Sequence, residues 1–559
     1  MSVYSKVESG TNRFRSRFHK SISYSKRYDC MFGEYIPVLS KFCLPGDVWK
    51  IGGNALVRFH PMVTPSLTPN YMKVRYFFVP LRLVEPNTEL IITGSKDGHL
   101  SSGTLPKFEN FVANANKVSY PNAYKVQKYS FWDYMGVQPG DYENIKNDAC
   151  LPSKYWLKAY LRIKWDYYDD ENISPTHINY SDFDSYISAV ESRGADYAPD
   201  SVQLKKDYFT SALPWQLKAP GGIAPAIDVV GSATFTPNFT GTLFESDGQN
   251  PQLNHPLNQK ALYVSGDNPY YTDLGLNTDN SADLSTLTNN KILNFLNASQ
   301  QNVVLTGLGF NVDDMRTVNA ETRVYERLAR CGSRYTEYLN SNFGIAPADE
   351  TLQRAQYLGG WSLPIVTTEV LQTAADGSTP VGTMRGHGIT NGGNTIGRFL
   401  CKEFGMLFGL AHIVPQTEYT TGIPKELTYK ERWDFFNPSF QHLSEQEVKN
   451  GELFISSSDG KNDDTFGFQA YANELRTSVN QTVGDLRDSL SYWTQSIHFT
   501  SRPNLNIALL SAGSHRGSFN APFAVNSTSA RPCIVDFYND LDVYRPMVRY
   551  STPGLVDHL

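Results

Sequence analysis

Short segments with a two-residue hydrophobic repeat recur far apart along this chain, and they restrict its fold more than any other feature of the sequence. The clearest lies at residues 72–78, where residues of two kinds alternate: Met72, Val74, Tyr76 and Phe78 against Lys73, Arg75 and Phe77. Such alternation is typical of a strand with one buried face, and Pro80 ends the run. Further strands are predicted at Val48 to Phe59, interrupted by Gly52-Gly53, and at Leu363 to Leu371, Ile497 to Leu510 and Cys533 to Tyr544. The sequence therefore predicts a β-rich scaffold with long connections.

Two segments between these strands have helical periodicity. The stretch from Ser153 to Tyr168 follows Pro152 and places four bulky residues on one face: Leu157, Leu161, Trp165 and Tyr168. Apolar residues also repeat at helical spacing between residues 324 and 338: Val324, Leu328, Cys331, Tyr335 and Tyr338. The Cys331-Gly332 pair would let this second helix pack closely against a neighbour, and residues 354–360 would turn the chain into the next strand. We therefore expect helices to decorate the sheets.

The length of the chain and its lack of linkers favour one large domain. Its 559 residues contain no Ser/Gly-rich or Pro-rich linker, and 40% of them are hydrophobic, which is enough for a substantial core. The 41 Gly and 31 Pro and the mean hydropathy of -0.39 are typical of a soluble, loop-rich protein. Residues 222–317 are rich in Asn, Asp, Gly, Ser and Thr. We interpret them as one long inter-strand insertion, either disordered or packed against neighbouring molecules.

The amino-terminal residues differ in charge from the rest of the chain. The formal net charge is -6, which excludes a generally basic nucleic-acid binder, yet residues 1–28 contain seven Lys or Arg against the single Glu8, with aromatic residues between them. Cations interleaved with rings suit single-stranded nucleic acid, because phosphates pair with the cations and bases stack on the rings. We predict a mobile basic arm over 1–28, with these DNA contacts: Arg13, Arg15, Arg17, Lys20, Lys26 and Arg27. A solvated tail, or an arm that clamps a neighbouring subunit, are the alternatives.

Cysteine usage and hydropathy indicate a protein made and used inside a cell. The six cysteines, at positions 30, 43, 150, 331, 401 and 533, include no CxxC pair, so free thiols are expected. The first thirty residues hold no apolar core of a secretory signal. The longest apolar stretch, Phe404 to Val414, is too short to span a bilayer, so no membrane insertion is expected.

Enzyme and metal-site signatures are lacking in the sequence. Gly386, Gly388 and Gly392 give GxGxxxG, and the spacing from Gly392 to Gly397 is followed by Arg398 instead of the Lys-Ser/Thr of a phosphate loop. A flexible glycine-rich loop is predicted there. The adjacent acidic pairs are typical of solvated loops: Asp169-Asp170, Asp313-Asp314 and Asp463-Asp464. The histidines show no HxxxH or HExxH spacing. We expect no catalysis, no cofactor and no metal.

A series of ordered motifs gives the chain a family resemblance. The segment YERLARCGSRYTEYLNSNFGIAPADETLQRAQYLGGW at 325–361 is followed by WDFFNP at 433–438, FGFQ at 466–469 and PGLVDH at 553–558. In this order the motifs resemble the capsid proteins of the Microviridae, small icosahedral phages with single-stranded DNA, and most closely the gokushovirus-like branch. Two positions depart from the family pattern: Phe404 stands where His is usual, and Ser444 where Gly is usual. These departures suggest a divergent branch.

The resemblance implies both a fold and a role. It implies an all-β fold, an eight-stranded antiparallel jelly roll with long loop insertions containing a few helices, over residues 29–559. It further implies sixty copies in a T=1 shell around circular single-stranded DNA, with minor virion proteins, assembled in the host cytoplasm. The insertion at 222–317 would form a surface protrusion that meets a host receptor, for which a glycan is one candidate. Subunit contacts are expected from one arginine-rich helix: Arg327, Arg330, Arg334 and Tyr335. The runner-up is a monomeric carbohydrate-binding or hydrolytic β-sandwich, suggested by the aromatic, Asn/Asp-rich loops.

Overall fold

The computed structural model describes most of the chain. The described residues are 18–93, 107–145, 150–173, 180–216, 312–331, 335–346, 348–373, 380–440, 445–525 and 530–547, without the side chains of 180–184, 312–315, 328, 331, 335 and 336. The chain divides into two compact units, Met1–Lys218 with Val324–Leu559, and Ala219–Arg323. Only residues 312–323 of the second unit are described. The predicted insertion at 222–317 therefore lies outside the described residues up to position 311.

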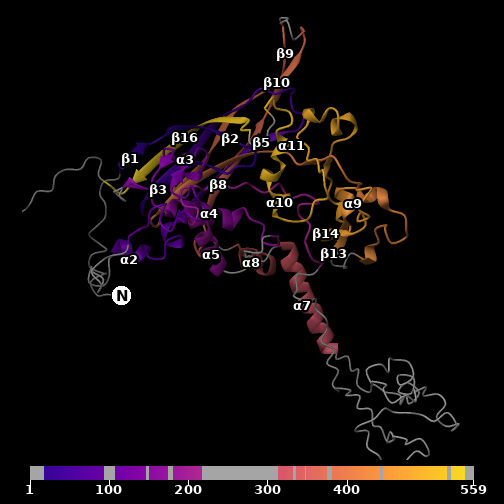
Figure 1. Cartoon of the computed structure of the whole chain (residues 1–559). Coiled ribbons are helices and arrows are strands. Elements are labelled where there is room, and N and C mark those ends of the chain that lie inside the picture. The colour runs from indigo at the N-terminus through magenta and orange to yellow at the C-terminus, as the bar shows by residue number, and fades with distance from the viewer. Residues whose placement is uncertain are drawn as a thin grey trace, which may run out of the picture. The chain divides into compact units, whose positions relative to one another are not determined.

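Two antiparallel sheets form the centre of the first unit (Figure 1). The six-stranded sheet has the order β1-β16-β4-β10-β9, with β2 also paired to β16, and the four-stranded sheet has the order β3-β11-β5-β8. Apart from β9 and β10, neighbours within a sheet are therefore far apart in sequence. The strands of the two sheets are β1 Phe18–Ser21, β2 Tyr24–Cys30, β3 Ile36–Cys43, β4 Val48–Phe59, β5 Asn70–Pro80, β8 Gln356–Ile365, β9 Thr367–Leu371, β10 Met384–Leu400, β11 Gly405–Pro415 and β16 Cys533–Arg545.

The core lies between the two sheets. Along β4, Trp49, Ile51 and Val57 are buried, whereas Lys50 and Arg58 are exposed, so one face points inward and the other outward. Trp361 of the four-stranded sheet stacks on Phe537 of the six-stranded sheet with ring centroids 6.1 Å apart. Phe78 contacts Phe399 across the same interface at 5.1 Å. Burial of these two inner faces is the main stabilising contribution of the fold.

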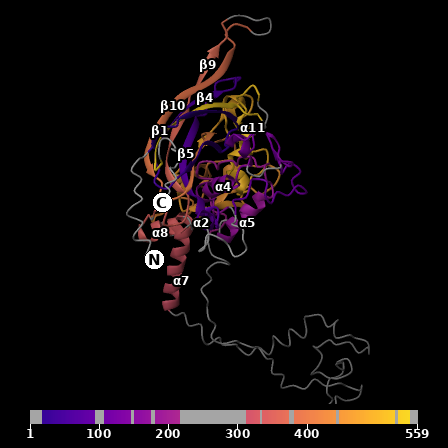
Figure 2. The same cartoon turned by 90° about the vertical axis from the view of Figure 1, so that its left-hand side faces the viewer.

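Helices cover the outer face of the four-stranded sheet. The ring of Trp156 on α4 lies 5.7 Å from that of Phe408 on β11, and Tyr167 lies 5.0 Å from Phe77 on β5. Figure 2 shows α4 and α5 on the side of the sheets away from β10. The outer face of the six-stranded sheet has no such helix among the described residues. The helices are α2 Thr88–Thr93, α3 Phe131–Met135, α4 Tyr155–Tyr167, α5 Tyr180–Glu191, α7 Val312–Cys331, α8 Tyr335–Phe343, α9 Asn450–Leu453, α10 Ile507–Leu510 and α11 Arg516–Phe519.

Three small two-stranded sheets complete the described structure. The pairs β13–β14 and β6–β7 are antiparallel, whereas β12–β15 is parallel. They lie in long connections between strands of the main sheets. Their strands are β6 Lys125–Val126, β7 Gly140–Asp141, β12 Glu418–Tyr419, β13 Glu445–Lys449, β14 Thr465–Ala470 and β15 Asn480–Gln481.

Most of the predicted strands and helices are confirmed, and four features are corrected. The strand predictions at residues 48–59, 72–78 and 533–544 match β4, β5 and β16, and the helix at 153–168 matches α4. The segment 363–371 is not one strand, because β8 and β9 meet at Val366. The predicted strand at 497–510 is wrong, since Asn506 caps α10 by accepting a hydrogen bond from the Leu509 backbone. The helix predicted from 324 to 338 ends at Cys331, before α8 begins.

The fourth correction concerns the glycine-rich segment at 386–397, which is not a loop but the centre of β10. A Cβ on Gly388 would lie 2.6 Å from the Phe59 ring, and one on Gly392 would lie 2.6 Å from Leu363. Glycine at these positions therefore gives space to the large side chains of neighbouring strands. For the same reason, Gly52-Gly53 does not interrupt β4.

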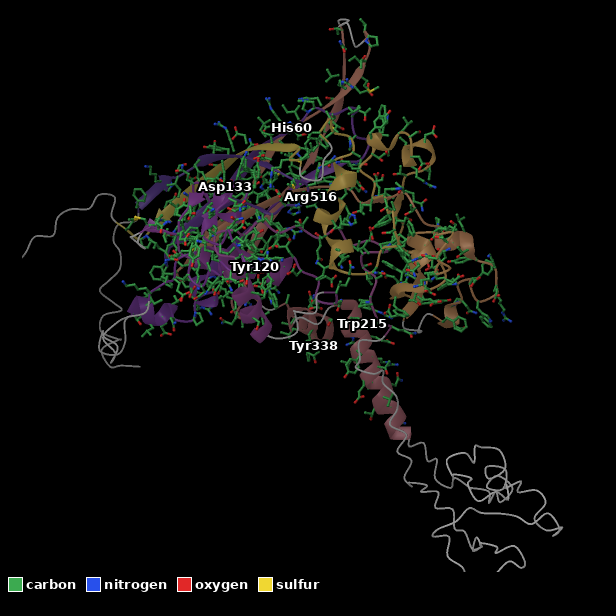
Figure 3. The ribbon with its side chains drawn as sticks, in the orientation of Figure 1. His60, Tyr120, Asp133, Trp215, Tyr338 and Arg516 are labelled. Carbon is green, nitrogen blue, oxygen red and sulfur yellow. The ribbon has the colours of Figure 1, made fainter. Side chains whose placement is uncertain are left out.

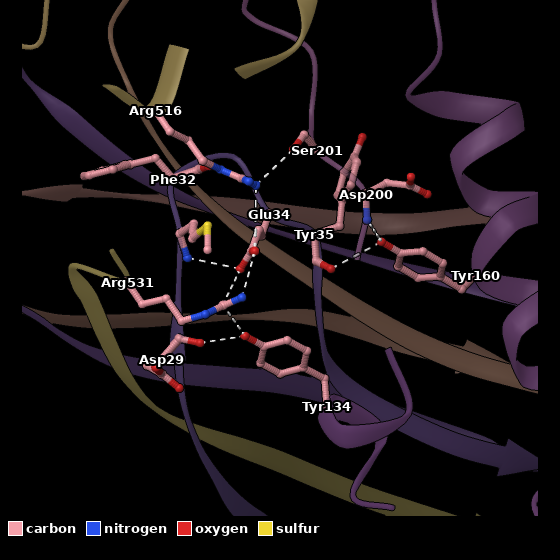
Figure 4. Close-up of polar contacts among 11 residues, drawn as sticks. Asp29, Phe32, Glu34, Tyr35, Tyr134, Tyr160, Asp200, Ser201, Arg516 and Arg531 are labelled. Carbon is pink, nitrogen blue, oxygen red and sulfur yellow. Dashed lines mark hydrogen bonds and ion pairs between the residues drawn. The ribbon is translucent and has the colours of Figure 1, made fainter. Parts of the chain in front are cut away.

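An ion-pair network joins the connection before β3 to the carboxyl-terminal third of the chain (Figure 4). Glu34 is 4% exposed and accepts two hydrogen bonds from Arg531, at 2.7 and 3.2 Å. A second arginine, Arg516, lies 3.7 Å away and donates to the Phe32 carbonyl and to Ser201. Segments more than 480 residues apart in sequence are thus held together by one buried carboxylate.

Candidate nucleic-acid interface and subunit contacts

Strand β2 contains two of the predicted DNA-binding residues and points them in opposite directions. It pairs with β16 so that Lys26 is opposite Phe537, on the inner face, and Arg27 is opposite Asp536, on the outer face. This follows from the two-residue repeat of a strand. Residues 18–28 are therefore part of the sheet and not of a mobile arm, because β1 and β2 form regular ladders with β16.

Lys26 is turned into the protein. Its ammonium group donates hydrogen bonds to the backbone carbonyls of Pro37, at 2.5 Å, and of Tyr134. Burial lowers the pKa of Lys26 to about 8, although Asp133 on α3, labelled in Figure 3, opposes the shift. The positive charge is used inside the subunit, so this geometry leaves Lys26 unable to reach a DNA phosphate.

Arg27 and Lys20 are both at the surface. The side chain of Arg27 is 79% exposed, and its Nε lies 3.1 Å from an oxygen of Asp536. Lys20 is exposed on β1. An exposed ion pair of this kind is weak, which leaves the guanidinium of Arg27 able to exchange partners. The remaining predicted DNA contacts, Arg13, Arg15 and Arg17, lie outside the described residues.

The outer face of the six-stranded sheet is balanced in charge. Where β2, β16, β4 and β10 align, it presents four cations and four acidic side chains: Arg27, Lys50, Arg58 and Arg398 against Asp29, Asp536, Asp540 and Asp542. Three of the four acidic residues lie on β16. This strand lies between β2, which contains Arg27, and β4, which contains Lys50 and Arg58. A neutral face gives little attraction for a polyanion. The described part of this face therefore offers no net positive charge for a nucleic acid.

The predicted subunit-contact helix α7 uses two of its arginines within the chain. Arg330 lies 3.0 Å from Glu445 of β13, and burial raises the pKa of Glu445 even though Arg330 opposes the shift. Arg327 donates to the side chain of Asn342 on α8 at 3.0 Å. Arg334 lies outside the described residues, as does the side chain of Tyr335. The described contacts of Arg327 and Arg330 therefore join segments of one subunit. A contact of these residues with a neighbouring subunit stays a prediction.

An exposed aromatic surface lies elsewhere and was missed in the sequence. Trp433, Phe435 and Phe436 are 58%, 57% and 43% exposed. Two of these rings pack on tyrosines. The ring centroids of Phe435 and Tyr429 lie 5.6 Å apart, and those of Phe436 and Tyr471 lie 5.9 Å apart. We call the surface formed by Tyr429, Trp433, Phe435, Phe436 and Tyr471 the aromatic groove, because all of these residues except Phe435 line a cavity of about 840 Å³. Exposed apolar surfaces of this kind mark contacts with other proteins. The signal was the run of aromatic residues in WDFFNP.

Comparisons with known proteins identify the family. Residues 5–555 match the model of the phage capsid protein (F protein) family. The chain belongs to this capsid protein family. It is similar to capsid protein VP1 of Chlamydia phage 1, with 27% identity over 99% of this chain and 97% of the relative. It is also similar to capsid protein VP1 of Bdellovibrio phage phiMH2K, with 28% identity over 97% and 95% of the two chains. The resemblance to capsid proteins of the Microviridae is thus confirmed.

A second exposed surface of this capsid protein is the ribbon formed by β9 and the start of β10. The ribbon stands clear of the two sheets in Figures 1 and 2. Four apolar side chains on and beside it are at least half exposed: Val366, Val370, Leu371 and Val381. Apolar residues on a protruding ribbon favour burial against another molecule. Both exposed surfaces are therefore candidate subunit contacts in a capsid protein.

The described residues of this capsid protein hold no cluster of three or more metal-ligating side chains. Among the helices in the described ranges, none is long and apolar enough to cross a membrane. The five described cysteines are free, and Cys331 lies outside the described side chains. The motif PGLVDH at 553–558 also lies outside the described residues.

Proposed function

We propose that the chain is the major capsid subunit of a small icosahedral phage, with a structural and non-enzymatic role. The observation that supports this most directly is the family match over residues 5–555. The relatives are capsid proteins that align over more than nine tenths of their own length, including that of Spiroplasma virus 4 at 92%. A match of this extent leaves little of the chain for a separate activity. The protein acts by associating with copies of itself.

The proposed fold is an eight-stranded antiparallel jelly roll. Its two sheets would be β2-β16-β4-β10 and β3-β11-β5-β8, and β1 and β9 would be additions at the edges. Support comes from the strand order, because consecutive strands alternate between the sheets from β2 to β5, and again from β8 to β16. A chain wound in this way closes both ends of the sandwich with loops. Those loops supply the long segments that meet neighbouring subunits.

Sixty copies would close into a T=1 shell. Support comes from the aromatic groove and the β9–β10 ribbon, which present apolar side chains to solvent on a single subunit. Different patches meeting head to tail around five-fold and three-fold axes generate closed rings, and self-complementary contacts at two-fold axes join the rings. Sixty subunits of 62.7 kDa give a particle of about 3.8 MDa before DNA is added.

The shell would enclose circular single-stranded DNA and would be the virion's outer coat, assembled in the host cytoplasm. The cations proposed to neutralise DNA are Arg13, Arg15 and Arg17, with exposed Lys20 and Arg27 at the start of the sheet. Lys26 is left out, because backbone carbonyls bind its ammonium group. Arg13, Arg15 and Arg17 lie at most five positions before Phe18, the first residue of β1, in the sequence. Minor virion proteins would share this interior.

The polar segment at 222–317 would serve host attachment. Its Asn-, Asp-, Gly-, Ser- and Thr-rich sequence is suited to contact with a hydrated surface, for example a host glycan receptor. Replacing residues 222–317 with a short Gly/Ser linker should leave particle assembly intact and abolish adsorption to host cells. If adsorption survives the replacement, the attachment role is wrong, whereas loss of assembly would give the segment a structural role instead.

Particle formation tests the central proposal. The purified full-length protein, expressed with and without single-stranded DNA, is examined by electron microscopy and by sedimentation velocity. Closed shells of uniform diameter and megadalton mass are expected. A stable monomer that binds or cleaves glycans would overturn the proposal and favour the β-sandwich alternative.

A further inference from the structure

A cationic cavity lies on the outer face of the four-stranded sheet, beside the end of α4. It has a volume of about 430 Å³. Lys73 and Arg75 of β5 and His412 of β11 form its floor, and Tyr168 and Lys205 contribute to its walls. Lys73 pairs directly with His412 across the two strands. Because residues two apart on a strand share a face, Lys73 and Arg75 point into the same cavity.

Among the described residues, Lys73, Arg75 and Lys205 form no ion pair with the acidic side chains that also line the cavity. Asp170 pairs with Lys206, and Asp169 lies 3.8 Å from Lys164. Two further acidic residues, Glu171 and Glu337, also line the cavity, and each takes part in an interaction. The pKa of Lys73 is lowered, first by burial and then by the positive charges of Arg75 and Lys205. Burial alone would lower this pKa, but the contributions of Arg75 and Lys205 reflect a locally positive potential at Lys73.

His412 adds a hydrogen-bonding group without a partner. It is 6% exposed, and its Nδ1 has no hydrogen-bond partner among the described residues. Burial, with Arg75 and Lys73 beside it, lowers the pKa of His412 to about 3, so the ring is neutral. Buried polar atoms almost always have a partner, and an orphan of this kind is typical of a site that a ligand or water completes. A neutral ring is free to donate one hydrogen bond to an anion.

We propose that this cavity binds a phosphate group, held by Lys73, Arg75 and Lys205 with His412 as a hydrogen-bonding partner. The planar fork of Arg75 suits two oxygens of one phosphate, and the two lysines supply further charge. The cavity is large enough for a phosphate with part of a nucleotide, so free inorganic phosphate and a phosphodiester of single-stranded DNA share the chemistry that the site recognises. The proposal goes beyond the capsid role and does not depend on DNA contacts by the amino-terminal residues.

Calorimetric titration of the assembled full-length protein with inorganic phosphate tests the site. Saturable binding is expected, and Lys73→Gln and Arg75→Gln should each lower the phosphate affinity at least tenfold. Lys205→Gln, at an exposed position that is safe for folding, should lower it several-fold. The matched control is Lys50→Gln, which removes an exposed lysine from the other sheet and should leave the affinity unchanged.

A short oligothymidylate then distinguishes the two sources of phosphate. If the oligothymidylate competes with inorganic phosphate, and if this competition is lost in Lys73→Gln, the ligand is a polynucleotide phosphodiester. If inorganic phosphate binds and the oligothymidylate does not compete with it, the ligand is a small anion. No saturable binding by the unaltered protein would overturn the proposal. Equal losses in Lys73→Gln and Lys50→Gln would also overturn it, because binding would then reflect overall charge.

Discussion

Glu34 and Arg531 form a bidentate ion pair in the interior of the subunit, with side chains 5% and 10% exposed. Arg531 also lies over the Tyr129 ring at 3.7 Å and donates to Tyr134 at 2.7 Å. Both terminal nitrogens of the arginine thus donate hydrogen bonds, whereas its buried Nε has no partner among the described residues. Because Arg531 lies in the connection that leads into β16, the pair fixes the last strand of the six-stranded sheet against the segment that leads into β3.

Replacing Glu34 with Gln should strongly destabilise the subunit. The substitution leaves Arg531 and Arg516 buried without their carboxylate, and breaking one partner of a buried pair costs about 3–5 kcal/mol. Urea denaturation of the isolated subunit measures the loss. Asp536→Asn, which removes the exposed partner of Arg27, should cost less than about 1 kcal/mol. Similar losses in the two variants would contradict the importance of burial.

Gly53→Ala should loosen the contact between the two sheets. A Cβ at Gly53 would lie 2.6 Å from the hydroxyl of Tyr76 and 2.8 Å from the Phe537 ring. Both rings are fully buried, so neither can move away, and overpacking of this kind costs about 1–3 kcal/mol. The midpoint of thermal unfolding should fall. Gly140→Ala is the control, since its nearest heavy atom would be 3.9 Å away, and it should leave the midpoint nearly unchanged.

Gly53 also shows what could be predicted from the sequence and what could not. The hydrophobic alternation located β4, β5 and β16, because period and burial are local properties of a strand. A glycine in the sequence, however, looks the same whether it interrupts a strand or gives space to the side chain of a neighbouring strand. Gly52-Gly53 and the segment 386–397 were interpreted as an interruption and a loop, whereas the structure uses them where a neighbouring side chain or backbone comes too close for a Cβ. That distinction depends on residues hundreds of positions away.

For a related reason, the sequence could not separate Lys26 from the other predicted DNA contacts. The residues Arg27 and Lys26 are adjacent and chemically alike, and only the pairing of β2 with β16 decides that one faces solvent and the other faces carbonyl groups. The family motif WDFFNP was recognised as a string, but its exposure follows from long-range packing around Tyr471. Composition could indicate a basic segment or an aromatic cluster, and it could not indicate which face would be buried.

The stability of the subunit should depend on pH through His412. The pKa of His412 in the folded protein is about 3, below its ordinary value of 6.5, so the unfolded chain binds this proton more readily. The contribution of the neutral ring is therefore complete above pH 6.5 and is lost as the pH falls towards 3, with a slope of up to about 1.4 kcal/mol per pH unit.

Urea denaturation between pH 5 and 6.5 in a buffer without phosphate measures this slope, since most carboxylates remain ionised in that range. His412→Gln should flatten the slope, whereas His60→Gln, at an exposed position, should retain it. An unchanged slope in His412→Gln would assign the pH dependence to other groups.

Arg13, Arg15 and Arg17 should account for much of the salt dependence of DNA binding. Replacing all three with Gln should reduce the slope of log affinity against log salt by about 2, because each phosphate contact on a single strand contributes roughly 0.7. Binding of a circular single-stranded DNA is measured between 50 and 200 mM salt, a range in which such slopes are resolved. Lys26→Gln is the control and should leave the slope unaltered. If the triple variant keeps the original slope, the segment before β1 does not contact DNA and the subunit-clamp alternative gains support.

The aromatic groove should be needed for assembly and not for folding. Trp433 and Phe435 are more than half exposed in a single subunit, so Trp433→Ser and Phe435→Ser remove little buried area and should change the free energy of unfolding by less than about 0.5 kcal/mol. If the groove is covered by a neighbouring subunit, the loss of one buried aromatic side chain should weaken each contact by about 2 kcal/mol or more. Light scattering should then show a critical concentration for particle formation raised at least tenfold. Val118→Ser, which removes an apolar side chain that is 96% exposed on another surface, should assemble normally. Normal assembly of both groove variants would exclude the groove as a subunit contact.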